Sequence, residues 1–337
     1  MHQLEQLAVQ VSESNRLLDQ GGVSRWRISL LLLDNVAELL MKRMCDKLLR
    51  DNEGTAQDLK IVRGQIAKGQ VHEELPPWLD DGTPPQLLSD LETELKNQLA
   101  APGEIEKIDG DFNRKVSYLI RNGYMSQPHA TVLKRLHQYR NEAQHGDKVR
   151  DATVLEAGKI YTYVTCSMMK EFEVSSYNSI MPKDLASLLP SGIQPDFSVQ
   201  SKVADILLAE SPIGTPSALS ETLSEHLIER LDEILDQVDY LESGMPFETD
   251  TPTRDKNLKM IQVNPWTPAP KKILDCRDIR RWRATAIGIA RSTEYVKGFE
   301  KFAALEMAIE PLEELVLVAV RALDRHIDEE IDRIRGH

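Results

Sequence analysis

Apolar residues recur every three or four positions through most of the chain, which is the spacing typical of helices. The strongest pattern runs from Arg25 to about Arg50, where apolar side chains occupy more than one stripe, as in a helix packed against several partners. A moderate pattern over residues 3–19 precedes it, and Gly21-Gly22 separates the two. A weaker helical pattern covers residues 55–68. The N-terminal region is therefore predicted to be helical.

Between about residues 70 and 110, prolines and turn residues replace the helical spacing, as in Pro76-Pro77 and Pro84-Pro85. Within this stretch only residues 86–99 regain a helical pattern. Further helices are predicted over 112–121, 129–145 and 155–172. The first 175 residues therefore predict a helical bundle with a proline-rich insertion at about 70–110.

The second half of the chain predicts a separate helical domain. Residues 176–216 contain repeated prolines and little periodicity, so they are predicted to be a connecting segment. Over 217–241 apolar side chains recur at alternating spacings of four and three, a heptad-like seam on a strongly acidic helix. Two more helices are predicted over 275–302 and 303–334. The fold class is thus all-α, with a bundle at 1–175 followed by a three-helix antiparallel domain at 217–337.

The composition suits a soluble helical protein. Aromatic residues make up 5% of the chain, which argues against a large β-sandwich. No run of about 18 apolar residues is present, so no membrane-spanning helix is predicted. The N-terminus lacks a basic stretch followed by an apolar one, and the three cysteines are far apart in sequence. We therefore expect a protein of the reducing cytoplasm, without a disulfide framework or a zinc site.

The charge is unevenly distributed along the sequence. The net charge of −13 argues against non-specific coating of nucleic acid, so any RNA contact is expected to be local. The segment from Phe112 to Arg150, however, contains eight lysines and arginines but only two acidic residues. The basic side chains predicted to contact RNA in this basic segment are Arg114, Lys115, Arg121, Lys134, Arg135 and Lys148.

The end of the predicted helix 129–145 carries the clearest chemical signal. It reads Tyr139-Arg140-Asn141-Glu142-Ala143-Gln144-His145-Gly146, and the glycine is a natural helix end. The Arg-to-His spacing alone is uninformative, because Arg321 and His326 repeat it within a long helical pattern, which we interpret as a solvated helix face. Only the first copy has an asparagine directly after the arginine, a glycine after the histidine and a basic setting. We interpret Tyr139 as a core aromatic residue.

The string Arg140-Asn141-x-x-x-His145-Gly146 resembles the R-x4–6-H motif of the HEPN superfamily (higher eukaryotes and prokaryotes nucleotide-binding domain). The resemblance covers at most residues 20–175. It implies an all-α domain and, as in many members, a ribonuclease that needs neither metal nor cofactor, because the 2′-hydroxyl of the RNA is the nucleophile. It also implies 2′,3′-cyclic phosphate and 5′-hydroxyl products, and a toxin or anti-phage effector acting on tRNA or other structured RNA.

The resemblance assigns catalytic roles to three side chains. An unperturbed histidine has a pKa of about 6.5, so His145 can exchange a proton near neutral pH. Arg140 carries a permanent charge suited to the developing charge on phosphate oxygens. Asn141 either donates to the scissile phosphate or holds the imidazole. Since residues five apart on a helix differ by about 140°, a single copy is a poor site. We therefore expect a two-fold homodimer in which both copies of this motif face each other.

Three polar residues, Asp34, Asn35 and Glu38, interrupt the apolar pattern of the strongest predicted helix. The simpler interpretation is a solvent-facing strip. The alternative is that one of them turns toward Arg140 or His145, because HEPN domains often add a polar residue from an earlier helix.

Two functions from different classes are compatible with the sequence. The first is the HEPN-type endoribonuclease. The second is a non-catalytic HEPN-like protein that serves as a dimerisation, interaction or sensor subunit of a larger complex. The acidic helix at 217–243 favours a protein partner in either case, since it could bind a basic partner or occupy the basic segment of its own chain.

Overall fold

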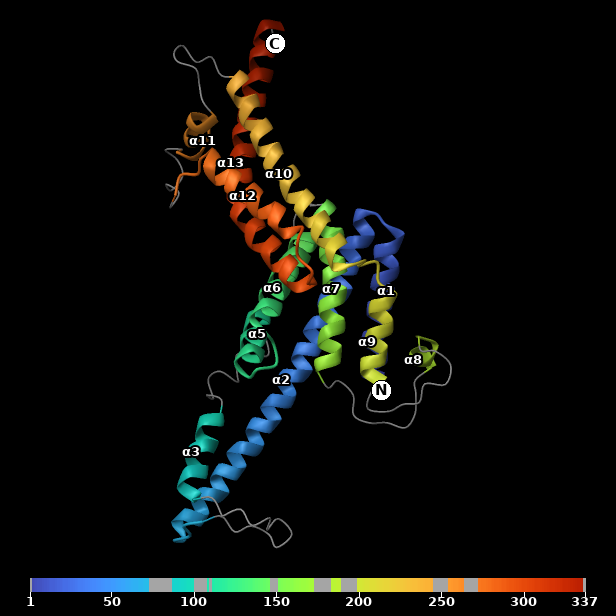
Figure 1. The fold of residues 1–337 in the computed structure, drawn as a ribbon, viewed down its shortest axis with the longest axis vertical. Helices are drawn as coiled ribbons and strands as arrows, with labels where there is room; N and C mark the ends of the chain where they lie inside the picture. The colour runs from blue at the N-terminus through green and yellow to red at the C-terminus, as the bar shows by residue number, and fades with distance from the viewer. Residues whose placement is uncertain are drawn as a thin grey trace. The chain divides into compact units, whose positions relative to one another are not determined.

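The structure is a computed structural model that describes residues 2–72, 87–99, 108, 111–145, 151–172, 183–188, 199–244, 254–263 and 272–335. Within these ranges the regular structure is helical, apart from one isolated bridge between His72 and Leu87, so the all-α fold class is confirmed. In chain order the helices are α1 (His2–Gln20), α2 (Val23–Ala67), α3 (Leu88–Gln98), α5 (Phe112–Arg121), α6 (Gln127–His145), α7 (Asp151–Glu171), α8 (Lys183–Leu188), α9 (Val199–Ala209), α10 (Pro216–Gly244), α11 (Arg254–Gln262), α12 (Cys276–Ile289) and α13 (Tyr295–Arg335) (Figure 1). None of the described helices is long and apolar enough to cross a membrane.

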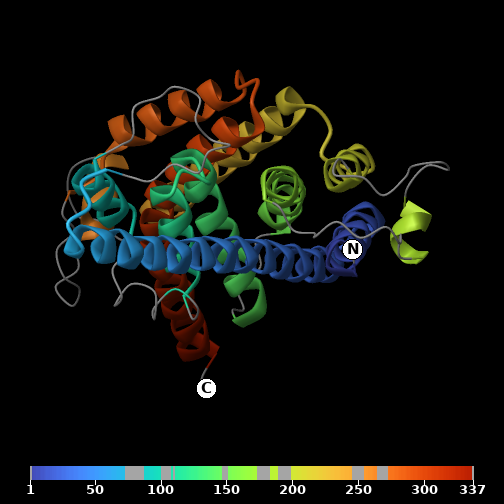
Figure 2. The same cartoon turned by 90° about the horizontal axis from the view of Figure 1, so that it is seen from below.

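Two predicted helix boundaries are wrong. Helix α2 runs without a break through Gly54, where the sequence predicted two helices (Figure 2). A glycine inside a helix costs only about 1 kcal/mol, and Leu59 and Val62 beyond it are buried. Near the C-terminus the break lies between Ile289 and Tyr295 rather than between residues 302 and 303. Phe302 and its neighbour Ala303 are both buried, so the helix continues there to complete one apolar face.

The chain divides into two compact units, each built from three separate segments. Unit 1 consists of Met1–Gln10, Asp34–Ala130 and Thr165–Ile206, and unit 2 of Val11–Leu33, Thr131–Val164 and Leu207–His337. Helices α1, α2, α6, α7 and α9 therefore contribute residues to both units. The sequence predicted a linear order of domains, whereas most of α6 and α7 group with the C-terminal helices.

In unit 1, polar contacts tie short helices to the long ones. Arg63 of α2 pairs with Glu92 of α3 at 2.9 Å, and α3 lies beside this end of α2 (Figure 1). The Gln200 amide of α9 donates to the carbonyl oxygens of Met169 and Phe172 at the end of α7. Carbonyls in the last turn of a helix lack intrahelical partners, so Gln200 caps α7. The predicted insertion at 70–110 lies largely outside the described residues. The predicted connecting segment at 176–216 is described over 183–188 and 199–216, where it contains helices α8 and α9.

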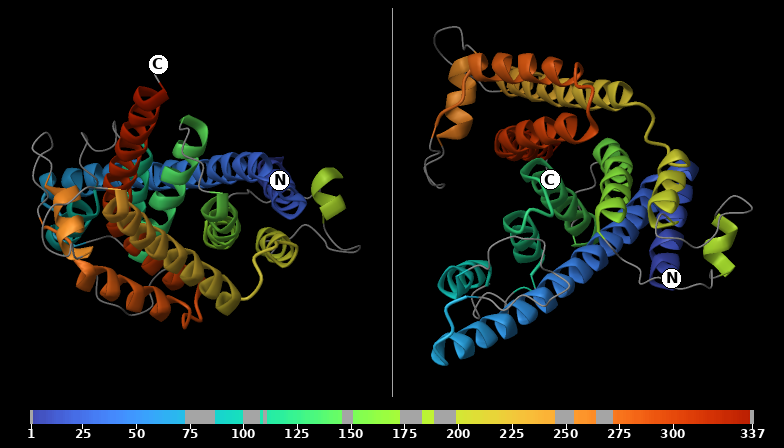
Figure 3. Two further views of the ribbon diagram at one scale, coloured as in Figure 1. Left: turned by 90° about the horizontal axis from the view of Figure 1, so that it is seen from above. Right: turned by 60° about the horizontal axis from the view of Figure 1, so that its bottom comes forward.

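In unit 2, helices α10, α12 and α13 form a three-helix bundle with the predicted up-down-up course (Figure 2, Figure 3). The pair of contacts from Tyr295 to Gly214 and from Tyr240 to Asp324 shows that α10 and α13 run in the same direction. Helix α12 runs opposite to them and is tied to α10 by an ion pair between Arg283 and Asp232. The predicted seam of α10 is buried throughout, at Leu223, Leu227, Leu231, Ile234, Val238 and Leu241.

The other segments of unit 2 approach closely through small and polar residues. A Cβ atom added to Gly158 of α7 would lie 2.5 Å from a methyl carbon of Leu18 in α1, so a glycine permits this contact. Asn15 of α1 donates to the Leu207 carbonyl oxygen at 2.7 Å and accepts from the Thr162 hydroxyl at 3.2 Å. These buried hydrogen bonds connect all three segments of the unit.

Candidate functional site on helix α6

The predicted catalytic residues occupy the last turns of α6. Arg140 and Asn141 are both half-buried, and the Arg140 guanidinium donates to the Gln144 side chain one turn later at 3.2 Å. His145 is the last residue of α6, but its side chain and Gly146 lie outside the described residues. Along a helix, Arg140 and His145 are about 7.5 Å and 140° apart. The structure thus places Arg140, Asn141 and His145 at one helix end.

The C-terminal end of α6 is held by an arginine that the sequence did not single out. Arg27, at the start of α2, donates through its guanidinium to the Ala143 carbonyl oxygen, with an Nε–O distance of 2.8 Å. The last four carbonyls of a helix have no intrahelical partner, and a cation there also interacts favourably with the helix dipole. Both residues belong to unit 2. No local pattern in the sequence indicates such a contact.

A buried carboxylate meets α6 one helical turn before the motif. Glu306 of α13 is fully buried. Its Oε2 atom accepts from Arg135 Nε at 3.1 Å and Arg135 Nη2 at 2.6 Å, and from the Tyr139 hydroxyl. Arg135 Nη2 also donates to Glu310 at 2.6 Å. Two residues of α6 are therefore bound to one carboxyl group of α13.

The other oxygen of Glu306 is bound from a third helix. Arg230 of α10 donates through Nη1 to Glu306 Oε1 at 2.8 Å. The same guanidinium forms two further bonds to Glu313, at 2.6 and 2.5 Å. We call Arg135, Tyr139, Arg230, Glu306, Glu310 and Glu313 the α6–α13 cluster. All six residues belong to unit 2.

The electrostatics of this cluster are governed by burial and by a surplus of carboxylates. Three carboxyl groups, those of Glu306, Glu310 and Glu313, meet two guanidinium groups, those of Arg135 and Arg230. Desolvation raises the pKa of Glu306 from its ordinary 4.5 to about 7, and the charge of Arg135 opposes that rise. Desolvation lowers the pKa of the Arg135 guanidinium, but the charges and hydrogen bonds of Glu306 and Glu310 together raise it above its ordinary value.

Aromatic rings pack beside the buried part of the cluster. The Arg135 guanidinium lies 4.6 Å from the centroid of the Tyr139 ring. Tyr139 meets Phe299 edge-on, and Phe299 contacts Phe302 with centroids 5.4 Å apart. Tyr139 is buried, which confirms that it is a core aromatic residue. Its hydroxyl bond to Glu306 was not predicted, because the partner is 167 residues away.

The residues predicted to contact RNA do not form one surface in the structure. Arg135 is buried in the α6–α13 cluster and therefore does not face RNA, and Lys115 is buried as well. Arg114 and Arg121 are exposed in unit 1, next to Asp111 and stacked on Tyr118 respectively. Lys134 is half-buried and belongs to unit 2. Lys148 lies outside the described residues.

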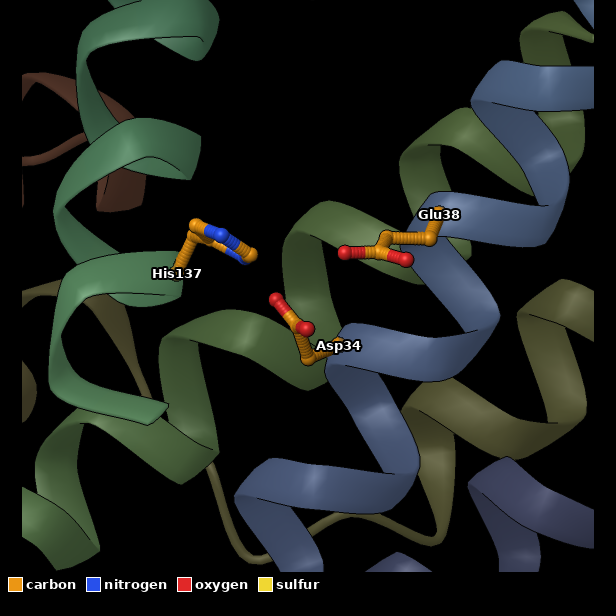
Figure 4. Close-up of side chains that lie close together, drawn as sticks. All are labelled: Asp34, Glu38 and His137. Carbon is orange, nitrogen blue, oxygen red and sulfur yellow. The ribbon is translucent and has the colours of Figure 1, made fainter. Parts of the chain in front are cut away.

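The polar residues in the middle of α2 have different environments. Asn35 is exposed and donates to Gln10 at 2.7 Å, as a solvent-facing strip predicts. Asp34 is only 1% exposed, so that interpretation is wrong for Asp34, and Glu38 is half-buried. Figure 4 shows both carboxylates on adjacent turns of α2, together with His137 of α6. No site is built from the three, because Asp34 and Glu38 belong to unit 1 and His137 to unit 2.

The second copy of the arginine–histidine spacing behaves as a solvated helix face. Arg321 and His326 are both exposed on α13. Between them, Arg325 donates to the Arg321 carbonyl oxygen at 3.3 Å. This copy provides a matched control for the motif on α6.

Comparison with known proteins adds no assignment. The chain matches no protein-family model, and neither its sequence nor its fold is significantly similar to a curated protein or a solved structure.

Proposed function

We propose that the protein is a metal-independent endoribonuclease of the HEPN type. The observation that carries the proposal is the position of Arg140, Asn141 and His145 on the final turns of a single helix, with Arg140 and Asn141 half-exposed. The expected substrate is a structured RNA such as tRNA, and the expected role is that of a toxin or anti-phage effector in the cytoplasm.

In this proposal the RNA supplies its own nucleophile. The 2′-oxygen attacks the adjacent phosphorus and the bond from phosphorus to the 5′-oxygen breaks, which leaves a 2′,3′-cyclic phosphate and a 5′-hydroxyl. One imidazole takes the proton of the 2′-hydroxyl, and a second gives a proton to the departing 5′-oxygen. A two-fold dimer supplies both imidazoles, one from each copy of His145. Arg140 stabilises the negative charge that builds up on the phosphate oxygens.

The proposal is tested with purified protein and total RNA in the presence of EDTA. The wild type is expected to cut RNA and leave 5′-hydroxyl ends. The substitution His145→Ala should slow cleavage by about 10²–10⁴-fold, which is the usual contribution of acid–base catalysis. His326→Ala, which alters the exposed copy of the same spacing, should cleave at the wild-type rate. Equal cleavage by the wild type and His145→Ala, or no cleavage by any of them, rules the proposal out.

A second candidate, a non-catalytic interaction subunit, is favoured by one observation. The apolar seam of α10 is used inside unit 2, but a row of carboxylates remains exposed along the helix. These exposed acids are Glu221, Glu225, Glu229, Glu233 and Asp236. Two other acids of α10, Asp232 and Asp239, pair with Arg283 and Arg254. A basic protein partner fits the exposed row, and the absence of cleavage in EDTA would favour this candidate over the ribonuclease.

A further inference from the structure

Helix α6 is attached to the C-terminal bundle immediately before its proposed catalytic residues. Arg135 and Tyr139 lie one turn apart on the same face of α6, and both donate to Glu306. Arg140 directly follows Tyr139, so it is only about 1.5 Å further along the helix axis. The contact therefore acts on the part of α6 that bears the motif.

We propose that Glu306 is a positioning residue for the α6 site. Through Glu306, the C-terminal bundle fixes the rotation of α6 about its own axis and its position along that axis. The inference rests on the proposed ribonuclease function, whose catalytic residues are Arg140, Asn141 and His145. Glu306 itself does not touch the RNA, because it is fully buried.

The directionality of the contacts supports this role. Apolar packing is non-directional and tolerates small rotations of a helix. Charge-assisted hydrogen bonds are short and depend on angle, so two donors one turn apart fix a helix about its own axis. A displacement of about 1 Å at a reacting group can lower a rate by about 100-fold. A small rotation of α6 is thus sufficient to misplace Arg140.

Glu306 is itself held firmly. Arg230 of α10 binds its second oxygen at 2.8 Å and is in turn held by two bonds to Glu313. On the other side of the motif, Arg27 binds the Ala143 carbonyl oxygen. Helix α6 is therefore anchored both before and after Arg140 and Asn141. This anchoring gives the C-terminal bundle a role in the site that its sequence does not reveal.

Two variants separate positioning from stability. Glu306→Gln keeps the size of the side chain but removes its charge. The triple variant Arg135→Met, Tyr139→Phe, Glu306→Leu replaces the polar contact with apolar packing, and such replacements of buried ion pairs are often neutral or stabilising. In the triple variant Arg230 keeps Glu313 as its partner. Glu329→Gln, at an exposed position of the same helix, is the matched control.

The readouts are RNA cleavage, the thermal midpoint of unfolding and hydrogen exchange of the peptide covering residues 136–145. We expect Glu306→Gln and the triple variant to lower kcat by about 100-fold. KM should change little, because RNA does not contact these residues. Exchange at 136–145 should be faster in both variants, while the triple variant retains the thermal midpoint of the wild type. Glu329→Gln should match the wild type in all three readouts.

The outcomes distinguish this inference from the proposed function. Wild-type kcat in a folded triple variant overturns the positioning role and leaves the ribonuclease intact. If the wild type cuts no RNA, the proposed function fails, and hydrogen exchange alone then decides whether Glu306 fixes α6. Unchanged exchange at 136–145 in the triple variant overturns the inference in that case. If Glu306→Gln does not fold, the triple variant carries the same test.

Discussion

At the scale of single residues, opposing electrostatic effects act on Glu306. It is surrounded by Arg135 and Tyr139 of α6, by Arg230 of α10, and by two carboxylates of its own helix, Glu310 and Glu313. Burial favours its neutral form and the two guanidinium groups favour its ionised form. Its pKa of about 7 indicates that burial has the larger effect.

This balance predicts how stability depends on pH. The pKa of Glu306 is 4.5 when unperturbed and about 7 in the folded protein, so between these values the unfolded state releases a proton that the folded state retains. The stabilising contribution of Glu306 is therefore complete below about pH 4.5 and is lost as the pH rises through 7, by up to about 3 kcal/mol.

Urea unfolding of the wild type and Glu306→Gln at a series of pH values measures this contribution. Glutamine does not titrate, so the difference in unfolding free energy between the two proteins should fall from pH 4.5 to 7 and then level off. A difference that grows over the same range would contradict the prediction, because it would mean that the guanidinium groups keep Glu306 ionised.

The sequence correctly placed Arg140, Asn141 and His145 at the end of a helix, but it did not predict the environment of individual charges. Tyr139 was correctly placed in the core, because it continues the apolar spacing of Leu136 and its neighbours. Arg135 was assigned to RNA contact, since a basic segment looks the same whether its arginines are exposed or paired. Its partner Glu306 is 171 residues away, and no local rule connects the two. Asp34, which the simpler interpretation placed on a solvent-facing strip, is also buried.

At the scale of elements, helix faces were more predictable than helix ends. The seam of α10 is buried as its heptad-like spacing predicted, because a helix with one apolar stripe must bury that stripe. The ends depend on a balance between weak local propensities and packing. Packing prevails at Gly54, which lies inside α2, and at Phe302 and Ala303, which continue α13.

The composition of unit 2 predicts the behaviour of a fragment that ends at residue 180. Such a fragment lacks α10 and α13, so Arg135 and Tyr139 lose Glu306, and Thr153 loses its 2.8-Å contact with His226. Removing one partner of a buried ion pair costs about 3–5 kcal/mol, which is a large part of the roughly 5–15 kcal/mol that stabilises a typical protein.

We therefore expect the 1–180 fragment to lose cooperative thermal unfolding and RNA cleavage, as measured by near-ultraviolet circular dichroism and by the EDTA assay. A folded fragment that cuts RNA faster than the full chain would contradict this expectation. It would instead support inhibition of the basic segment by the acidic face of α10.

At the scale of the whole molecule, the proposed site depends on two copies of the chain. Arg140 and His145 point about 140° apart on an ideal helix, and a two-fold axis would bring both motifs to one cleft. We expect light scattering to give twice the 38.2-kDa mass of a single chain at working concentration. A strict monomer that still cleaves RNA would exclude a composite site.

The division into units could not be predicted from sequence, because each unit combines three segments that are distant along the chain. Composition indicated a proline-rich break at 176–216, and such breaks usually separate domains in linear order. Here buried hydrogen bonds instead join residues 11–33, 131–164 and 207–337, as at Asn15, Thr162 and Leu207. Hydrogen bonds between residues so far apart in sequence form only when the whole chain has folded.

The distance in sequence between Arg135 and Glu306 also sets a delay during synthesis. The two residues are 171 positions apart, and a ribosome adds about 5–20 residues per second, so Glu306 is made roughly 10–30 s after Arg135. Throughout that interval α6 exists without the carboxylate proposed to orient it. Under the proposed function, we expect the nascent chain to lack RNA cleavage until α13 has been made.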